Sequence, residues 1–173
     1  MQKLNKFSKI FLFIFAVGGV IWLGSYITRL TLFYRLFQEE QFALREYITE
    51  QNLFVILQIL LSAVSINIIF YPLMITAFFL FVISSKLNLR QNGWLFISLL
   101  IVVITLPFEL YLMIIDYKIF ILITNAVFNS KEAVNLIVKR FTVLGSFSII
   151  EMLSFFSILY LFMFQPLTKN TNT

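Results

Sequence analysis

Two glutamates lie inside long apolar stretches of the chain, where an acidic side chain can do chemistry. Glu109 and Glu151 are each flanked on both sides by mostly apolar residues. A carboxyl group held in such a setting can exchange a proton, bind a cation or pair with a base. These two residues are therefore the first candidates for an ion or proton site, or for a polar substrate pocket.

Other polar residues recur beside the two glutamates at helical spacing. Ser148 precedes Glu151 by three residues and Thr105 precedes Glu109 by four, so each shares a helix face with its glutamate. Asp116 continues the face of Glu109 after seven further residues. The predicted intramembrane polar site comprises Glu109, Glu151, Arg29, Ser148, Thr105, Ser65 and Asp116.

Arg29 is the expected partner of these acids. At 1.5 Å per residue it lies about 28 Å along the first apolar segment, while Glu109 and Glu151 lie about 25 Å and 21 Å along theirs. Similar heights favour a buried Arg29 paired with one or both glutamates, because each charge removes the other's cost of burial. In the alternative, the polar residues only hold helices together, and Arg29 extends to the membrane surface.

The positions of the charges define four apolar segments. No charge falls in residues 10–28, 51–85 or 91–108, and residues 141–164 contain only Glu151. About 20 apolar helical residues cross a bilayer core of about 30 Å, so each segment is long enough to span it. The composition agrees, with 61% hydrophobic and only 12% charged residues, against about 25% charged in soluble domains.

The chain is therefore predicted to be an all-α, polytopic membrane protein with four long helices in one transmembrane domain, residues 1–173. Short connections between the segments favour an up-down-up-down bundle. The expected helices cover about 8–48, 53–85, 92–128 and 131–165, followed by a polar tail at 166–173.

These helices are longer than a membrane requires. Apolar residues continue at helical spacing from residue 30 to residue 48, among charged residues, which favours an amphipathic extension of the first helix. The bundle is expected to project beyond the membrane on the side of the 1–2 and 3–4 turns. One alternative breaks the third helix near Asp116 and lays residues 119–128 in the membrane interface.

Basic residues indicate the orientation. The side that holds both termini carries six Lys or Arg and no acid, whereas the other side carries seven bases and six acids. Lys3, Lys6 and Lys9 precede the first segment, which shows no cleavage site and is expected to remain as a helix. We expect both termini in the cytoplasm, in the inner (plasma) membrane of a bacterium.

Missing residue types exclude several kinds of chemistry. The chain has no His and no Cys, so imidazole and thiolate ligands for metals or haem, Cys nucleophiles and His-based triads are not available. We expect no cofactor and no metal. Nucleic acid is not an expected partner, because the basic residues lie at the membrane edges. The expected partners are the lipid bilayer and either other membrane protein subunits or a second copy of this chain.

Three functions remain. The favoured one is a non-catalytic accessory, assembly or anchoring subunit, or a homo-oligomer. The second is a small ion- or proton-coupled transporter or channel that uses Glu109 and Glu151. An enzyme acting on lipids ranks third, since the chain lacks a D-x-D or glycine-rich phosphate motif.

Overall fold

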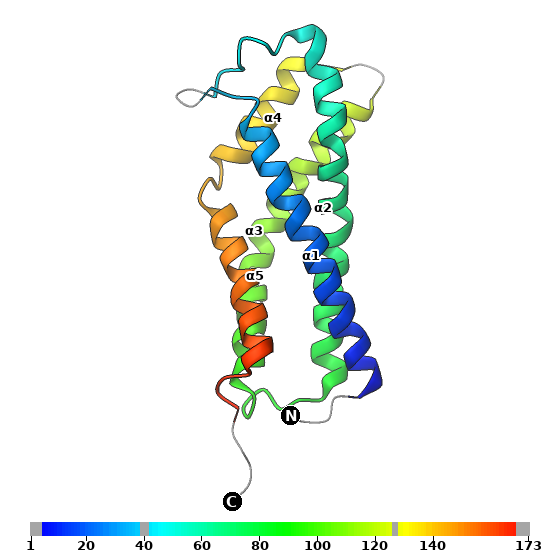
Figure 1. Cartoon of the computed structure of the whole chain (residues 1–173), viewed down its shortest axis with the longest axis vertical. Coiled ribbons are helices and arrows are strands. Elements are labelled where there is room, and N and C mark those ends of the chain that lie inside the picture. Colours follow the sequence, from blue (N-terminus) through cyan, green and yellow to red (C-terminus); the bar gives the residue numbers. More distant parts are fainter. Residues whose placement is uncertain (1–4, 39–41, 126–127, 169–173) are drawn as a thin grey trace, which may run out of the picture. The chain divides into compact units, whose positions relative to one another are not determined.

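The computed structural model describes residues 5–38, 42–125 and 128–168, and most of them are helical (Figure 1). The helices are α1 (Lys6–Tyr34), α2 (Glu50–Ser85), α3 (Gly93–Thr124), α4 (Ser130–Thr142) and α5 (Phe147–Phe164). Within this part of the chain only isolated bridges occur, at Phe37–Leu44 and Asn92–Thr168, and no strand. The predicted all-α class is confirmed. Predicted features at Lys3, Glu39, Glu40 and residues 169–173 lie outside the described residues.

Four of these helices are long and apolar enough to cross a membrane. They are α1, α2, α3 and α5, with 29, 36, 32 and 18 residues, and their most apolar windows have mean hydropathies of 2.0 to 2.5. Each of the four predicted apolar segments contributes one of them. The prediction of four candidate spans is therefore confirmed.

The two central helices follow the sequence closely. α2 and α3 begin and end within a few residues of the predicted 53–85 and 92–128, and both continue through an internal proline, Pro72 and Pro107. The alternative break near Asp116 does not occur, because α3 is continuous to Thr124. Proline is tolerated in an apolar helix when neighbouring groups satisfy the backbone that it frees.

The predicted continuation of the first helix to residue 48 is wrong. α1 ends at Tyr34, and the chain then folds back. The backbone N–H of Gln38 donates to the Ala43 carbonyl at 2.8 Å, and the backbone N–H of Arg45 donates to the Leu36 carbonyl at 3.0 Å. Phe42, with φ of 51°, adopts the left-handed conformation that such a reversal requires. Residues 35–38 and 42–49 are called the α1–α2 connector below.

Packing explains why helical spacing misled the prediction at this point. The Arg45 Nε donates to the Phe37 carbonyl at 3.1 Å and the Tyr47 hydroxyl to that of Arg35 at 3.2 Å, so side chains satisfy carbonyls just beyond the helix end. The apolar residues Phe37 and Ile48 are buried without a helix. The helical spacing of the apolar residues indicates that Phe37 and Ile48 are buried. It does not indicate the backbone conformation that buries them.

The predicted fourth helix, 131–165, is also wrong as a single element. Residues 143–146 form turns that separate α4 from α5. Gly145 lies in this break, where an added Cβ would be 2.9 Å from the carbonyl oxygen of Phe141. Apart from Leu144, residues 142–146 are Thr, Val, Gly and Ser, which are weak helix formers and favour an interruption.

The described residues form two compact units, and α1, α2 and α3 contribute to both. Unit 1 consists of residues up to Gly19, Pro72–Glu109 and residues from Ser146 onward; unit 2 consists of Val20–Tyr71 and Leu110–Gly145. Unit 1 has an aromatic core around Phe162 of α5. Its ring centroid lies 5.1 Å from Trp94, 5.4 Å from Phe81 and 5.6 Å from Phe15.

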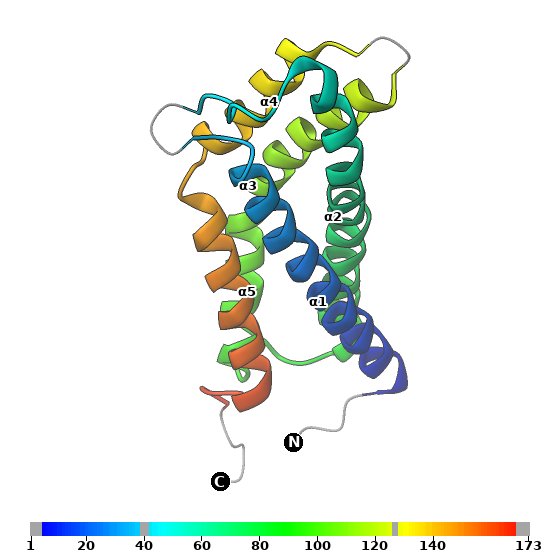
Figure 2. The same cartoon turned by 45° about the horizontal axis from the view of Figure 1, so that its top comes forward.

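Unit 2 has its own aromatic core around Phe141 of α4. Ring centroids lie 4.8 Å away at Tyr34, 6.3 Å at Phe33 and Phe42, and 6.5 Å at Phe37. These contacts hold the α1–α2 connector beside α4, an arrangement visible in Figure 2.

α4 begins with a side-chain cap, in which the Asn129 Oδ1 accepts from Glu132 N–H at 3.2 Å.

Replacing Gly19 by alanine should destabilise unit 1. An added Cβ would overlap the Phe155 ring and lie 3.3 Å from the Met74 sulfur. Overpacking of this kind costs about 1–3 kcal/mol, so we expect a lower midpoint for thermal loss of helical circular dichroism in detergent.

The matched control is Gly24→Ala, because, apart from the adjoining residues and backbone of its own helix, no atom of the described residues lies within 4 Å of its added Cβ. Alanine favours a helix over glycine by about 0.5–1 kcal/mol, so this variant should melt at the same temperature or higher. Equal destabilisation by both variants would contradict the close packing at Gly19.

Candidate intramembrane polar site

The chain buries an ion pair between α1 and α3 in unit 2. The Arg29 Nη1 donates to the Asp116 Oδ2, and both side chains are almost fully buried, at 1% and 2% exposure. Both residues belonged to the predicted polar site. A charge pair taken out of water requires such direct contact, because each partner alone would carry a large desolvation penalty.

A second arginine joins the same carboxylate. The Nε of Arg140, from α4, lies 3.3 Å from the Asp116 Oδ1 and donates to the Oδ2 at 3.5 Å. Arg140 is also buried. One carboxylate thus holds guanidinium groups from two helices while it lies on a third; we call Arg29, Asp116 and Arg140 the arginine cluster.

Aromatic rings extend the arginine cluster along α1. The guanidinium carbon of Arg29 lies 4.8 Å from the ring centroid of Tyr26, in a cation–π arrangement. The Tyr26 ring contacts Trp22 at 5.1 Å, and Trp22 contacts Tyr71 of α2 at 5.8 Å. The ring faces give Arg29 a favourable electrostatic environment in addition to its carboxylate.

A polar contact between α1 and α2 lies in the same unit. The Ser25 hydroxyl donates to the Ala63 carbonyl at 3.0 Å, and the Asn67 amide donates to the Ser25 hydroxyl and to the same carbonyl, the latter at 2.9 Å. Asn67 is buried. α2 thus contributes a buried polar side chain to unit 2. Hydrogen bonds of this kind hold apolar helices together.

Three further residues of the predicted site are buried and belong to unit 1. Glu109, Glu151 and Ser148 are buried in unit 1, at 2%, 4% and 9% exposure. Their helices meet at Phe108 and Phe147, whose ring centroids are 5.1 Å apart. α3 and α5 therefore bring both acids into one compact unit, each next to or one turn from an aromatic contact.

Two predicted site residues bond to their own helices. The Thr105 hydroxyl donates to the Ile101 carbonyl at 3.0 Å, and the Ser65 hydroxyl to the Leu61 carbonyl at 2.8 Å; both side chains are half-buried. Gln58 and Ser62 precede Ser65 at helical spacing on α2 and are exposed. On this helix Asn67, rather than Ser65, is the buried polar residue.

The sequence predicted a carboxylate partner for Arg29, but it favoured Glu109 and Glu151, whereas the ion pair in the structure is with Asp116. The Arg29 side chain is buried against Asp116 and does not extend from the protein surface. Arg140 was missed as a site residue. A signal existed, since Arg140 follows Ala133 and Ile137 by seven and three residues on the buried face of α4.

The chemistry available to the arginine cluster is limited. Guanidinium groups do not lose their protons in proteins, so Arg29 and Arg140 act as permanent charges and hydrogen-bond donors. Across the described ranges, no three His, Cys, Asp or Glu side chains are grouped so that they could hold a metal ion. The cluster is suited to fixing three helices electrostatically rather than to proton transfer.

Comparison with known proteins does not assign the chain to a family. No family model matches it, and neither a curated protein nor a solved structure matches it significantly. Function must therefore be inferred from the residues and their geometry.

Replacing Asp116 by asparagine should destabilise the protein strongly. The substitution leaves two buried guanidinium groups without their shared anion, and removal of one member of a buried pair typically costs about 3–5 kcal/mol. We expect a clear fall in the thermal midpoint measured in detergent.

Glu132→Gln is the matched control, because Glu132 also carries a negative charge but is exposed on α4. Its midpoint should stay close to that of the unmodified protein. Adding Arg29→Gln and Arg140→Gln to Asp116→Asn should recover part of the loss. An Asp116→Asn protein as stable as the control would show that the cluster contributes little.

Proposed function

We propose that this chain is a non-catalytic multi-pass membrane protein, acting as an accessory, assembly or anchoring subunit or as a homo-oligomer. The observation that carries the proposal is the arginine cluster, whose charges are buried against one another. Such an arrangement stabilises a fixed contact between α1, α3 and α4. The chain's lack of His and Cys supports a role without catalysis.

The lengths of the helices support a part that projects from the membrane. α2 has 36 residues, or about 54 Å at 1.5 Å per residue, against a bilayer core of about 30 Å. Arg29 and Asp116 each lie 23 residues after the first residue of their helices, or about 35 Å along them. We infer that the arginine cluster lies near the membrane boundary and that the projecting part is available to partners.

We also propose that the spans run up-down-up-down, with both termini in the cytoplasm of a bacterium and the protein in its inner membrane. The distribution of charged residues supports this orientation. Lys6, Lys9, Lys86 and Arg90 lie on the proposed cytoplasmic side, where the chain has no acid. The α1–α2 connector and the first turn of α4 would then lie on the opposite side.

The absence of cysteine allows this topology to be tested with single cysteines. Glu46, Asn125 and Asn88 are exposed, so a cysteine can be placed at each. A membrane-impermeant maleimide applied to intact cells should label positions 46 and 125 but not position 88, which should react only after lysis. Labelling of 46 and 125 from opposite sides would overturn the bundle, and labelling of 88 alone would invert it.

The subunit role predicts stable association. Affinity purification of the tagged protein in a mild detergent should recover a second membrane protein, or a second copy of this chain, in stoichiometric amount. Glu109→Gln with Glu151→Gln should leave this association unchanged, because the proposal gives the two acids no role in it. Recovery of the unmodified protein as a lone monomer would contradict the proposal.

The second candidate function is a small ion- or proton-coupled transporter or channel. It is favoured by the burial of two acids, Glu109 and Glu151, in one unit among apolar helices, since acids within spans often belong to ion or proton pathways. It would replace the first proposal if liposomes containing the protein showed a pH-dependent flux that the double glutamine variant abolished. Flux equal to that of empty liposomes would remove it.

A further inference from the structure

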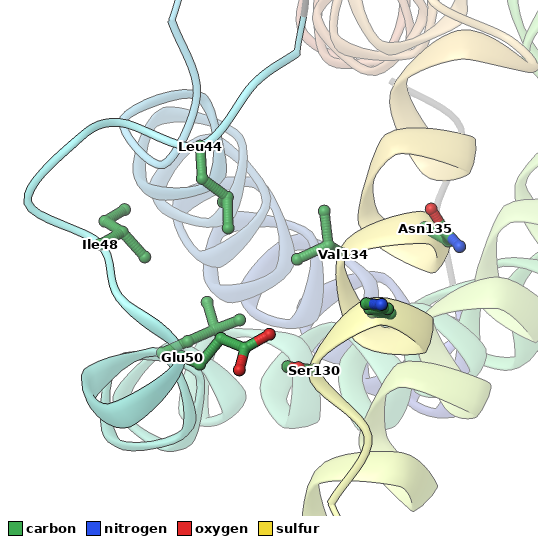
Figure 3. A pocket seen from close by; sticks show the side chains of 8 residues that line it. Leu44, Ile48, Glu50, Ser130, Val134 and Asn135 are labelled. Carbon is green, nitrogen blue, oxygen red and sulfur yellow. The ribbon is translucent and has the colours of Figure 1, made fainter.

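Unit 2 contains a pocket where the α1–α2 connector, the start of α2 and the start of α4 meet (Figure 3). Its volume is about 320 Å³, within the range typical of small-molecule sites. The apolar part of the lining comes from all three elements and consists of Leu44, Ile48, Leu53 and Val134. The pocket therefore offers an apolar wall to a ligand of moderate size.

The polar part of the lining carries both signs of charge. Glu50, the first residue of α2, lies opposite Ser130, Lys131 and Asn135 from the first two turns of α4. In Figure 3 the Glu50 carboxylate points across the opening toward Ser130. Glu50 and Lys131 both line the pocket, and among the described residues the structure gives no ion pair between them.

This division of charge defines the chemistry of a matching ligand. The Glu50 side offers only acceptor oxygens, whereas Ser130, Lys131 and Asn135 offer a hydroxyl, an ammonium and an amide as donors. Three donors suit an anion with several oxygens, such as a phosphate, and the acceptor suits an ammonium group. The lining contains no aromatic residue, so it lacks the ring faces that bind quaternary ammonium groups.

We propose that this pocket binds a primary ammonium joined to a phosphate, the chemistry of a phosphoethanolamine headgroup. The ammonium donates to Glu50, and the phosphate accepts from Lys131 and its neighbours on α4. The apolar wall receives the carbon atoms that link or extend these groups. The same chemistry is present in an ethanolamine phospholipid of the membrane and in a free aminophosphate. The site does not depend on whether the protein is a subunit or a transporter.

Native mass spectrometry of the detergent-solubilised protein tests the proposal. Three lipids with identical acyl chains are compared, with ethanolamine, choline or glycerol attached to the phosphate. We expect the ethanolamine lipid to bind at least about tenfold more tightly than the other two, a difference of about 1.4 kcal/mol. Equal binding of the three lipids would overturn the proposal.

Two charge variants assign the binding to the pocket. Glu50→Gln should abolish the preference for ethanolamine over glycerol headgroups, and Lys131→Met should weaken binding of all three lipids. The matched controls, Glu46→Gln and Lys139→Met, remove exposed charges outside the lining and should change nothing. Since Glu50 and Lys131 are themselves exposed, their variants should fold, which an unchanged melting temperature will verify. Charge variants that bind like the controls would overturn the proposal.

A third variant and a soluble probe complete the test. Val134→Phe should fill the pocket and reduce binding while both charges remain. Free O-phosphoethanolamine that displaces the ethanolamine lipid identifies the headgroup as sufficient and admits a soluble source. Binding of the lipid without displacement identifies the membrane as the source. Undiminished binding by Val134→Phe would place the lipid elsewhere and overturn the assignment.

Discussion

A single carboxylate, that of Asp116, is the interaction on which unit 2 depends. It lies on α3 and contacts Arg29 of α1 and Arg140 of α4, in surroundings that exclude water. Charges in such a place are stable only when direct contacts replace hydration, so the three helices must adopt one particular arrangement. Apolar packing alone is less directional, because many arrangements of leucine and phenylalanine bury similar areas.

The helices were predictable from the sequence where the length and polarity of an apolar segment determined them. α2 and α3 follow from the length and polarity of their apolar segments, and the prolines within them do not interrupt them. The end of α1 at Tyr34 was not predictable in this way. Phe37 and Ile48 have helical spacing, yet they are buried where the chain folds back, and the Phe37 ring contacts Phe141, a residue far along the sequence.

The polar site was predictable in kind but not in its pairing. Burial of charged residues inside apolar segments, as for Glu109, Glu151 and Arg29, follows from the cost of exposing charge to lipid. The choice of Asp116 as partner depends on how helices rotate and pack, which periodicity alone does not determine. Arg140 was missed because its neighbours Lys139 and Lys131 are exposed, and the three bases look alike in a list of charges.

The interruption between α4 and α5 has a function in unit 2. Because α4 is a separate helix, its short amphipathic sequence can bury Ile137 and Arg140 while it exposes Lys139. The same helix supplies Phe141 to the aromatic core and Val134 to the pocket. Gly145 and Ser146, which are poor helix formers, therefore make possible an element on which three separate features depend.

The order of synthesis adds a demand that the folded molecule does not reveal. Arg29 and Asp116 are 87 residues apart, so at about 5–20 residues per second the ribosome adds the aspartate roughly 4 to 17 seconds after the arginine. Arg140 follows 24 residues later still. Until Asp116 and then Arg140 have been made, Arg29 lacks the carboxylate that it contacts in the folded protein, and the carboxylate lacks its second guanidinium group.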